Sequence, residues 1–337
     1  MYHNYLLISP AKMEAKFTGD AVISTVSYGG AGEVSKSVAV IACTVMAILY
    51  VAILYAPTLI LRLPPSDSFQ SYMIRRFICA GVSSVFSLIA CSLILPIQWG
   101  KSHFSDVYGI RLDHIWQAVI FPLTLTSLMY AGTLILKLLL LLDSAQEDRE
   151  NGRSLSLDII KNAFHEFIES ISSMASNISA WRNYFVAPLT EELVFRACMI
   201  PLLLCGGFGT YKVVFLCPIF FSLAHLNHLL EYAQRSGSWL KALMTVGFQV
   251  GYTVIFGSYA SFLFVRTGHL TAPLVAHIFC NYMGLPVIIS RRTGMITVAS
   301  VAGLLGFIWL LFPLTSPHLY NATTDNCMCW HRYCSWS

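Results

Sequence analysis

Charged residues are scarce in this sequence. Asp, Glu, Lys and Arg together make up 11% of the 337 residues, whereas hydrophobic residues make up 56%. In soluble domains roughly a quarter of all residues are charged, so this composition excludes one large water-soluble domain. The net charge of +4 comes from scattered residues rather than from a basic stripe, which gives no indication of a nucleic-acid interface.

Several sequence signatures of hydrolases are missing as well. The chain contains no Gly-x-Ser-x-Gly nucleophile elbow and no His-Glu-x-x-His zinc helix. Most of its ten cysteines lie in apolar segments, where a free thiol behaves as a small hydrophobic side chain. The others, Cys327, Cys329 and Cys334 with His331, lack the paired spacing of a zinc finger. We therefore predict neither a metal site nor a cysteine nucleophile.

Long apolar runs are the main feature that is present. About 20 apolar residues in a helix cross a hydrocarbon core of roughly 30 Å. Eight such runs occur, near Val38–Leu61, Phe77–Ile97, Ile115–Leu142, Tyr184–Leu204, Val213–Leu230, Leu240–Phe264, Leu270–Ile289 and Ile296–Leu314. The predicted fold class is therefore all-α, a polytopic integral membrane protein with about eight transmembrane helices.

The polar parts of the chain suggest its organisation. Residues 1–35 form a polar N-terminal segment, residues 36–314 the membrane domain and residues 315–337 a C-terminal tail. A polar connector, residues 143–182, is either an interfacial amphipathic segment or an ordinary cytosolic linker. More Lys and Arg residues follow the odd-numbered runs than lie on the other side, so the positive-inside rule places those loops in the cytosol and both termini in the lumen.

Two adjacent carboxylates, Glu191 and Glu192, interrupt the fourth apolar run. Ionisable side chains within a membrane are costly, so a functional role is the first hypothesis. On a helix Arg196 lies about 40° round the axis from Glu192 but about 140° from Glu191. This geometry predicts a Glu192–Arg196 ion pair and leaves Glu191 unpaired in a cavity as a candidate general base. A purely structural Glu–Arg network between helices is the alternative.

Two other apolar runs carry further polar side chains. His225 shares a helical face with Phe221 in the fifth run, and nearly with His228. In the seventh run His277 and Asn281 are four residues apart and therefore project from one face. Each could be a hydrogen-bonding residue between helices, but together they form a set of polar groups in lipid.

The depths of these groups agree. Counted from a basic residue at the cytosolic end of each helix, Glu191, His225 and Asn281 all lie about 14–15 Å along the axis. The basic residues are Arg182, Arg235 and Arg291. His277 lies about one turn deeper. We therefore expect the polar groups to meet in one layer around an intramembrane catalytic cavity.

This set of groups suits hydrolysis by activated water. A carboxylate and an imidazole can deprotonate one water for attack on a carbonyl carbon, and a second imidazole with a carboxamide can donate hydrogen bonds to the oxyanion. Because the signatures of serine, cysteine and zinc hydrolases are missing, activated water remains as the nucleophile. The predicted reaction is hydrolysis of a peptide bond.

Three motifs resemble those of a known family, the intramembrane glutamate proteases that include the type 2 CAAX prenyl endopeptidases, or Ras-converting enzymes. The motifs are Glu191-Glu192-Leu-Val-Phe-Arg196, Phe221-Ser-Leu-Ala-His225 and His277-Ile-Phe-Cys-Asn281. They match the family's Glu-Glu-x-x-x-Arg, Phe-x-x-x-His and His-x-x-x-Asn patterns in order and type. The strong similarity covers about residues 181–286, which we take as the motif core.

The resemblance implies a substrate and a location. The substrate would be a protein ending in Cys-a-a-X, such as a small Ras-type GTPase, whose cysteine bears a farnesyl or geranylgeranyl group. The enzyme would remove the last three residues at the endoplasmic reticulum membrane, in contact with lipid and with its active site open to the cytosol. No cofactor and no metal would be required.

The resemblance also implies roles for individual residues. Glu191 and His225 would activate the water. His277 and Asn281 would stabilise the oxyanion. Supporting residues would be Glu192, Arg196, Phe221 and His228.

Two other interpretations remain open. A zinc-dependent intramembrane metalloprotease could use imidazole and carboxylate ligands, namely His225, His228, His277 and Glu191. A proton-coupled transporter or a non-catalytic scaffold could keep the polar cavity for lipid or partner binding. The lack of internal repeats argues against the transporter.

Overall fold

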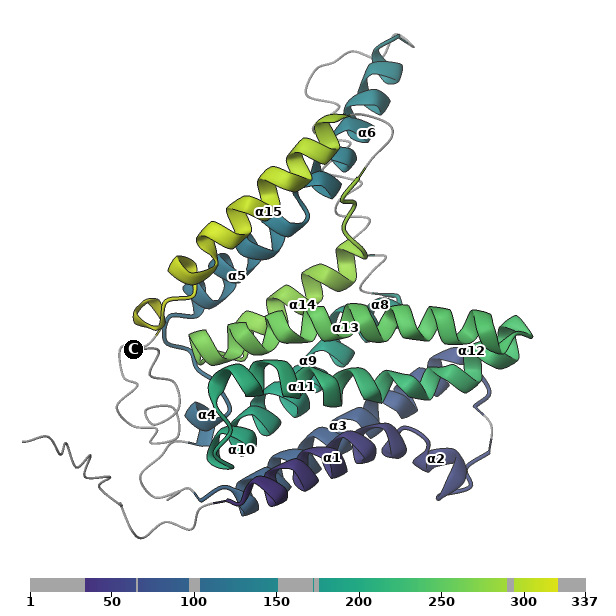
Figure 1. Cartoon of the computed structure of the whole chain (residues 1–337). Coiled ribbons are helices and arrows are strands. Elements are labelled where there is room, and N and C mark those ends of the chain that lie inside the picture. The colour runs from purple at the N-terminus through teal and green to yellow at the C-terminus, as the bar shows by residue number, and fades with distance from the viewer. Residues whose placement is uncertain are drawn as a thin grey trace, which may run out of the picture. The chain divides into compact units, whose positions relative to one another are not determined.

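The computed structural model describes residues 34–64, 66–96, 104–150, 172, 176–289 and 294–320. Throughout these residues the regular structure is helical, with no strand (Figure 1). The prediction of an all-α fold is confirmed. The amphipathic part of the connector, most of residues 1–35 and nearly all of the tail lie outside the described residues, so the proposed domain boundaries stay predictions.

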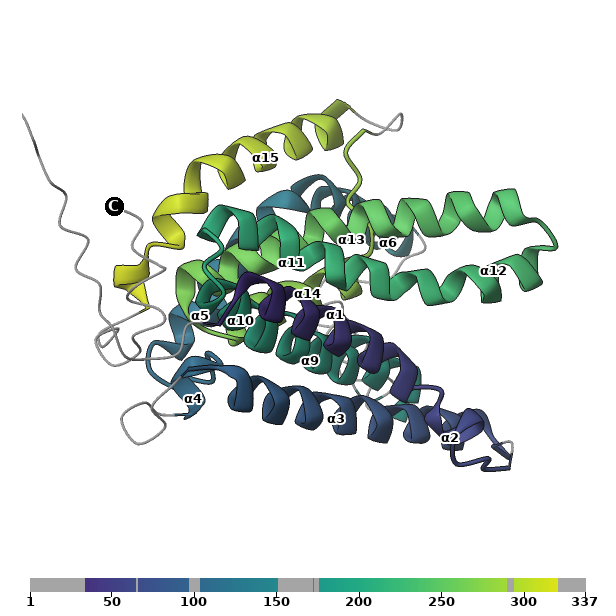
Figure 2. The same ribbon diagram turned by 60° about the horizontal axis from the view of Figure 1, so that its bottom comes forward.

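Two long helices form the N-terminal part of the described chain. They are α1 (Lys36–Ile53) and α3 (Phe69–Ile94), separated by the short α2 (Ala56–Leu59). Each long helix begins after a serine whose hydroxyl accepts a backbone N–H bond, Ser35 for α1 and Ser68 for α3. α1 and α3 lie side by side (Figures 1 and 2).

A bent pair of helices follows the short α4 (Phe104–Val107). α5 (Ile115–Met129) and α6 (Ala131–Glu150) correspond to the third apolar run, but they meet at Tyr130 with a bend of 78°. α15 (Gly294–Leu314) packs along both of them (Figure 1). Gly303 permits this approach, because a Cβ there would lie 2.2 Å from the Leu128 carbonyl oxygen. The third run is therefore a broken helix rather than a straight one.

The fourth apolar run is one nearly continuous helical rod with two π-helical turns. Its parts are α8 (Ile178–Trp181), η1 (Arg182–Val186), α9 (Ala187–Glu192), η2 (Leu193–Cys198) and α10 (Met199–Cys205). The turns η1 and η2 are π-helical and flank the two carboxylates, a distortion that is frequent at functional sites. Residues 194–205 are buried throughout, so this rod lies at the centre of the core.

The C-terminal half surrounds this rod with three further helical segments. α11 (Thr210–Ala224) continues through the 3-10 turn η3 (His225–Asn227) into α12 (His228–Ser236). α13 (Trp239–Thr267) packs along α11 and α12 and ends at Gly268, whose φ of 66° forms a left-handed helix cap. α14 (Thr271–Met283) packs against α13, α5 and the carboxylate-bearing rod, and η4 (Pro317–Leu319) follows α15.

Four of the described helices are long and apolar enough to cross a membrane. They are α1, α3, α13 and α15, and the bent α5–α6 pair would be a fifth. Their outward faces carry large apolar side chains, such as Ile78, Leu93 and Trp309, as expected of helices in contact with lipid. The chain is thus a multi-pass membrane protein. Eight crossings remain a prediction, because α11 and α14 have only 15 and 13 residues.

Candidate active site

Glu192 and Arg196 form an ion pair inside the protein. Nη1 of Arg196 lies 3.1 Å from Oε1 of Glu192, and both side chains are fully buried. The predicted pairing is confirmed. Two charges buried together still lose their hydration, so the surroundings of Arg196 matter for the stability of the site.

Aromatic rings supply much of that environment. The guanidinium carbon of Arg196 lies 4.5 Å from the centroid of the Phe221 ring on α11 and 6.0 Å from that of Phe256 on α13. A cation over an aromatic face is stabilised by the ring quadrupole. Gly257 leaves the space for the guanidinium, because a Cβ there would lie 3.2 Å from Nη2. Phe221 therefore acts first as a packing surface for Arg196.

His277 lies between the two carboxylates. Its Nδ1 is 2.7 Å from Oε1 of Glu192, and its Nε2 is 3.7 Å from Oε2 of Glu191. A carboxylate can only accept, so Nδ1–H donates to Glu192, which also accepts from Arg196. Glu191 was expected to be unpaired. Instead it faces an imidazole that Glu192 orients.

His225 lies at the end of α11, where the chain tightens into the 3-10 turn η3. Its Nδ1 is 3.0 Å from the Phe221 carbonyl oxygen, so Nδ1–H donates that bond. In the neutral imidazole Nε2 is then the unprotonated, basic nitrogen. The ring also packs edge-on against Phe221, with centroids 4.9 Å apart. One backbone bond thus determines which His225 nitrogen is a base.

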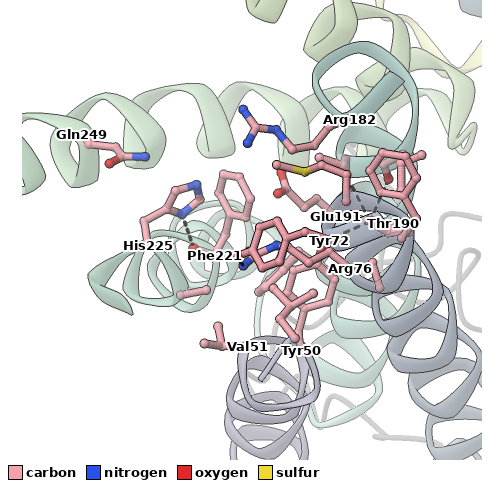
Figure 3. A pocket seen from close by; sticks show the side chains of 18 of the residues that line it. Tyr50, Val51, Tyr72, Arg76, Arg182, Thr190, Glu191, Phe221, His225 and Gln249 are labelled. Atoms are coloured by element: carbon pink, nitrogen blue, oxygen red, sulfur yellow. Dashed lines mark hydrogen bonds between the residues drawn. The ribbon is translucent and has the colours of Figure 1, made fainter. Parts of the chain in front are cut away.

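Glu191 and His225 line one cavity of about 780 Å³ (Figure 3). The α1 and α3 side contributes mainly apolar groups, among them Val51, Leu54, Met73 and Phe77. The opposite side contributes the carboxylate of α9, the imidazole of η3 and Gln249 of α13. The prediction placed a carboxylate and an imidazole near one water, and the two groups indeed share this cavity. A cavity lined by both apolar and polar groups suits a substrate that has a hydrocarbon part and a polar part.

The other two predicted residues, His277 and Asn281, are not among the residues that line this cavity. His277 is behind Glu191. Asn281 donates an Nδ2–H bond of 2.8 Å to the carbonyl oxygen of Asn183 in η1, and so joins α14 to the carboxylate-bearing rod. The side chain of His228, predicted to support the site, lies outside the described residues.

Sequence reasoning missed several polar groups of the cavity. The Tyr50 hydroxyl on α1 lies 3.0 Å from the Thr190 hydroxyl, next to Glu191. Gln249 also lines the cavity, as do Arg76 and Arg182. Gln249 had a detectable signal, since it is an isolated amide in a long apolar run. Arg182 had been used as a reference for depth in the membrane, and no role had been predicted for Arg76.

The zinc alternative requires at least three ligands that converge. Among the described His, Cys, Asp and Glu side chains no such group of three has the geometry of a metal site. The His228 side chain, one of its four proposed ligands, is not described. Metal analysis of the purified protein is the direct test of this alternative.

Comparison with known proteins identifies the family. Residues 174–283 match the family model described as Type II CAAX prenyl endopeptidase Rce1-like. Over 306 residues the chain is 56% identical to CAAX prenyl protease 2 of Arabidopsis thaliana, covering 90% of this chain and 98% of the relative. Over 297 residues it is 37% identical to CAAX prenyl protease 2 of Homo sapiens, covering 85% and 83%. No solved structure matches significantly. The chain therefore belongs to the type II CAAX prenyl endopeptidase family, and it is a membrane peptidase.

Proposed function

We propose that this chain is an intramembrane endopeptidase that removes the C-terminal aaX tripeptide from prenylated CAAX proteins, small Ras-type GTPases among them. The observation that carries the proposal is the position of Glu191. It lines the cavity together with His225, while His277 faces its carboxylate from behind. The names of the relatives, CAAX prenyl protease 2, support the substrate class.

In the proposed mechanism the Glu191 carboxylate takes a proton from a water bound in the cavity. Nε2 of His225 accepts the second hydrogen bond of that water and so orients it. The water oxygen attacks the carbonyl carbon of the prenylated cysteine, and a tetrahedral oxyanion forms. When the C–N bond breaks, protonated Glu191 returns the proton to the departing amine of the tripeptide. Atoms balance without a metal or cofactor.

His277 and Asn281 are proposed to donate hydrogen bonds to the oxyanion. The Nδ2 atom of Asn281 carries two hydrogens, and its bond to Asn183 uses one of them. In His277 Nδ1 donates to Glu192, so the proposed donor to the oxyanion is Nε2, which faces Oε2 of Glu191 at 3.7 Å. Nε2 carries a hydrogen when the ring is an imidazolium.

The proposed setting is the endoplasmic reticulum membrane, with the cavity open to the cytosol and the prenyl chain entering from lipid. The apolar side chains that α1 and α3 contribute to the cavity, such as Val51 and Phe77, suit a hydrocarbon chain. Arg76 and Arg182 also line the cavity, and the positive-inside rule favours the cytosolic side for such residues.

A peptidase assay with purified protein tests the proposal. We expect cleavage of a farnesylated Cys-a-a-X peptide directly after the cysteine, and much slower cleavage of its unprenylated twin. The Glu191→Gln variant should not cleave either peptide, and a chelator should leave the wild-type rate unchanged. Equal rates for the two peptides would refute the substrate assignment, and loss of activity with the chelator would favour the zinc alternative.

A further inference from the structure

Two guanidinium groups line the cavity that also contains Glu191 (Figure 3). Arg76 comes from α3 and Arg182 begins η1. Neither meets a carboxylate among the described residues. Nη1 of Arg76 donates to the Tyr72 hydroxyl at 3.0 Å, and Nε of Arg182 donates to Oδ1 of Asn183 at 2.9 Å. Each guanidinium has five N–H donors, and most of them have no partner among the described residues, so they remain for a ligand.

These neighbours orient the arginines without neutralising them. A phenol hydroxyl and a carboxamide oxygen carry no net charge, and the Tyr72 ring lies 5.7 Å from the Arg76 guanidinium carbon. The Glu191 carboxylate of the same cavity forms no ion pair with either arginine among the described residues, so both guanidinium groups can still attract the anion of a ligand. A carboxylate is the anion that a planar guanidinium binds best, through two parallel hydrogen bonds.

The spacing of Arg182 from Glu191 matches the length of the proposed leaving group. Arg182 is nine residues before Glu191 on the same helical rod, or at most about 13–14 Å along its axis, because the π-helical η1 rises less per residue than an α-helix. An extended tripeptide spans at most about 10 Å, and the long arginine side chain covers the remaining distance. A scissile bond at Glu191 therefore brings the free C-terminus, three residues further on, close to Arg182.

We propose that Arg182 and Arg76 bind the C-terminal carboxylate of the substrate and so hold the scissile bond at Glu191. The inference rests on the proposed function and adds a specificity determinant to it. The fixed distance between Glu191 and Arg182 then explains why three residues are removed. A peptide extended by one or two residues beyond X would place its carboxylate past the arginines.

The test compares two farnesylated peptides that differ only at the C-terminus, one a free acid and the other a carboxamide. For the wild type we expect kcat/KM to be about ten- to a hundredfold higher for the acid, as for loss of a charge-assisted hydrogen bond. Arg182→Gln and Arg76→Gln should each lower kcat/KM for the acid, mainly through KM, and change the amide rate little. Arg182→Lys should restore part of the preference, because it keeps the charge but loses the two-bond geometry.

Arg75→Gln is the matched control. Arg75 precedes Arg76 on α3, but its Nη1 donates to the Pro64 carbonyl oxygen at 2.7 Å, and it is not among the residues that line the cavity. Its replacement removes the same charge from the same helix. We expect it to leave the acid-to-amide ratio within about twofold of the wild type, since Arg75 does not line the cavity in which the carboxylate would bind.

The outcomes separate this inference from the proposed function. If the wild type cleaves acid and amide equally well, the carboxylate site is wrong while the peptidase function stands. The same conclusion follows if Arg182→Gln lowers both rates by the same factor, or if Arg75→Gln abolishes the preference. If the wild type cleaves neither prenylated peptide, the proposed function and the inference both fail. Retained amide cleavage shows that an arginine variant is folded.

Discussion

Glu191 and Glu192 are adjacent in the chain, yet they have different partners. Glu192 is fully buried and accepts hydrogen bonds from Arg196 and His277. Glu191 has a partly exposed side chain, lines the cavity and faces Nε2 of His277 at 3.7 Å. A helix separates neighbouring side chains by about 100°, so one carboxylate can stabilise the core while the other faces the substrate.

The first prediction concerns this division of roles. Glu191→Gln should lower turnover by at least about a hundredfold, the usual contribution of a general base, and leave the melting temperature unchanged. Glu192→Gln should weaken folding by on the order of 3 kcal/mol, because Arg196 then keeps a buried charge without its anion. Activity assays and thermal unfolding of both variants measure the two effects. Equal losses of activity without any loss of stability would contradict the division.

The second prediction concerns Asn281. Asn281→Ala should lower kcat by about a hundred- to a thousandfold, as for loss of one oxyanion donor, with little change in substrate affinity. Asn281→Asp should be at least as harmful, because a carboxylate repels the developing negative charge. Single-turnover rates and binding measurements distinguish the alternatives. A variant that binds poorly but turns over normally at saturation would remove Asn281 from the oxyanion site.

At the scale of elements, the site depends on how closely α11 and α13 approach each other. Phe221 of α11 contacts Arg196, His225 and His277 through its ring. Gly257 of α13 lies opposite, where a Cβ would be 2.9 Å from Cβ of Pro218 on α11. The packing of these two helices therefore sets the position of the Glu192–Arg196 pair, and through His277 that of Glu191.

The third prediction tests this close approach. Gly257→Ala should reduce stability by about 1–3 kcal/mol, the usual effect of overpacking, and should lower activity by displacing Arg196. Gly247→Ala is the control on the same helix, because a Cβ there meets nothing within 4 Å. It should be neutral or should stabilise α13 by up to about 1 kcal/mol. Thermal unfolding that ranks the two variants in the opposite order would rule out the tight contact.

At the scale of the whole molecule, the cavity combines surfaces from both ends of the sequence. α1 and α3 contribute apolar side chains together with Arg76, whereas Glu191, His225 and Gln249 come from the rod of residues 178–205, η3 and α13. A prenylated peptide also combines the two kinds of group, with a hydrocarbon chain on one residue and peptide bonds beside it. The orientation of this arrangement in the membrane follows from charge alone and needs a direct measurement.

The fourth prediction concerns that orientation. A glycosylation tag fused to the N-terminus should be modified in microsomes, because both termini are predicted to be lumenal. The same tag inserted at Gly237, between α12 and α13, should remain unmodified, because that loop is predicted to be cytosolic. The electrophoretic mobility of each fusion before and after deglycosylation shows whether its tag was modified. The reverse pattern would show that the predicted topology is inverted and that the cavity does not open to the cytosol.

Some of these features were determined by the sequence itself. Apolar runs are a local property, so they predicted an all-helical membrane protein, and the family motifs predicted a peptidase. The Glu192–Arg196 pair could also be predicted from the sequence, because residues four apart on one helix share a face whatever surrounds them. Depth in the membrane could be predicted in the same way. Glu191 and His225 lie at similar distances along their helices from a basic residue, and this predicted that they meet in one cavity.

Tertiary structure decided the rest, because it depends on which helices touch. His277 is 85 residues from Glu192 in the chain, and no local rule places its ring between the two carboxylates. The bend of α5 on α6, the Asn281–Asn183 bond and the position of Arg76 from α3 in the cavity that Glu191 lines also arise from packing between segments of the chain. Helical periodicity says which side chains share a face, whereas side-chain volume and close approaches such as that at Gly257 decide what the face meets.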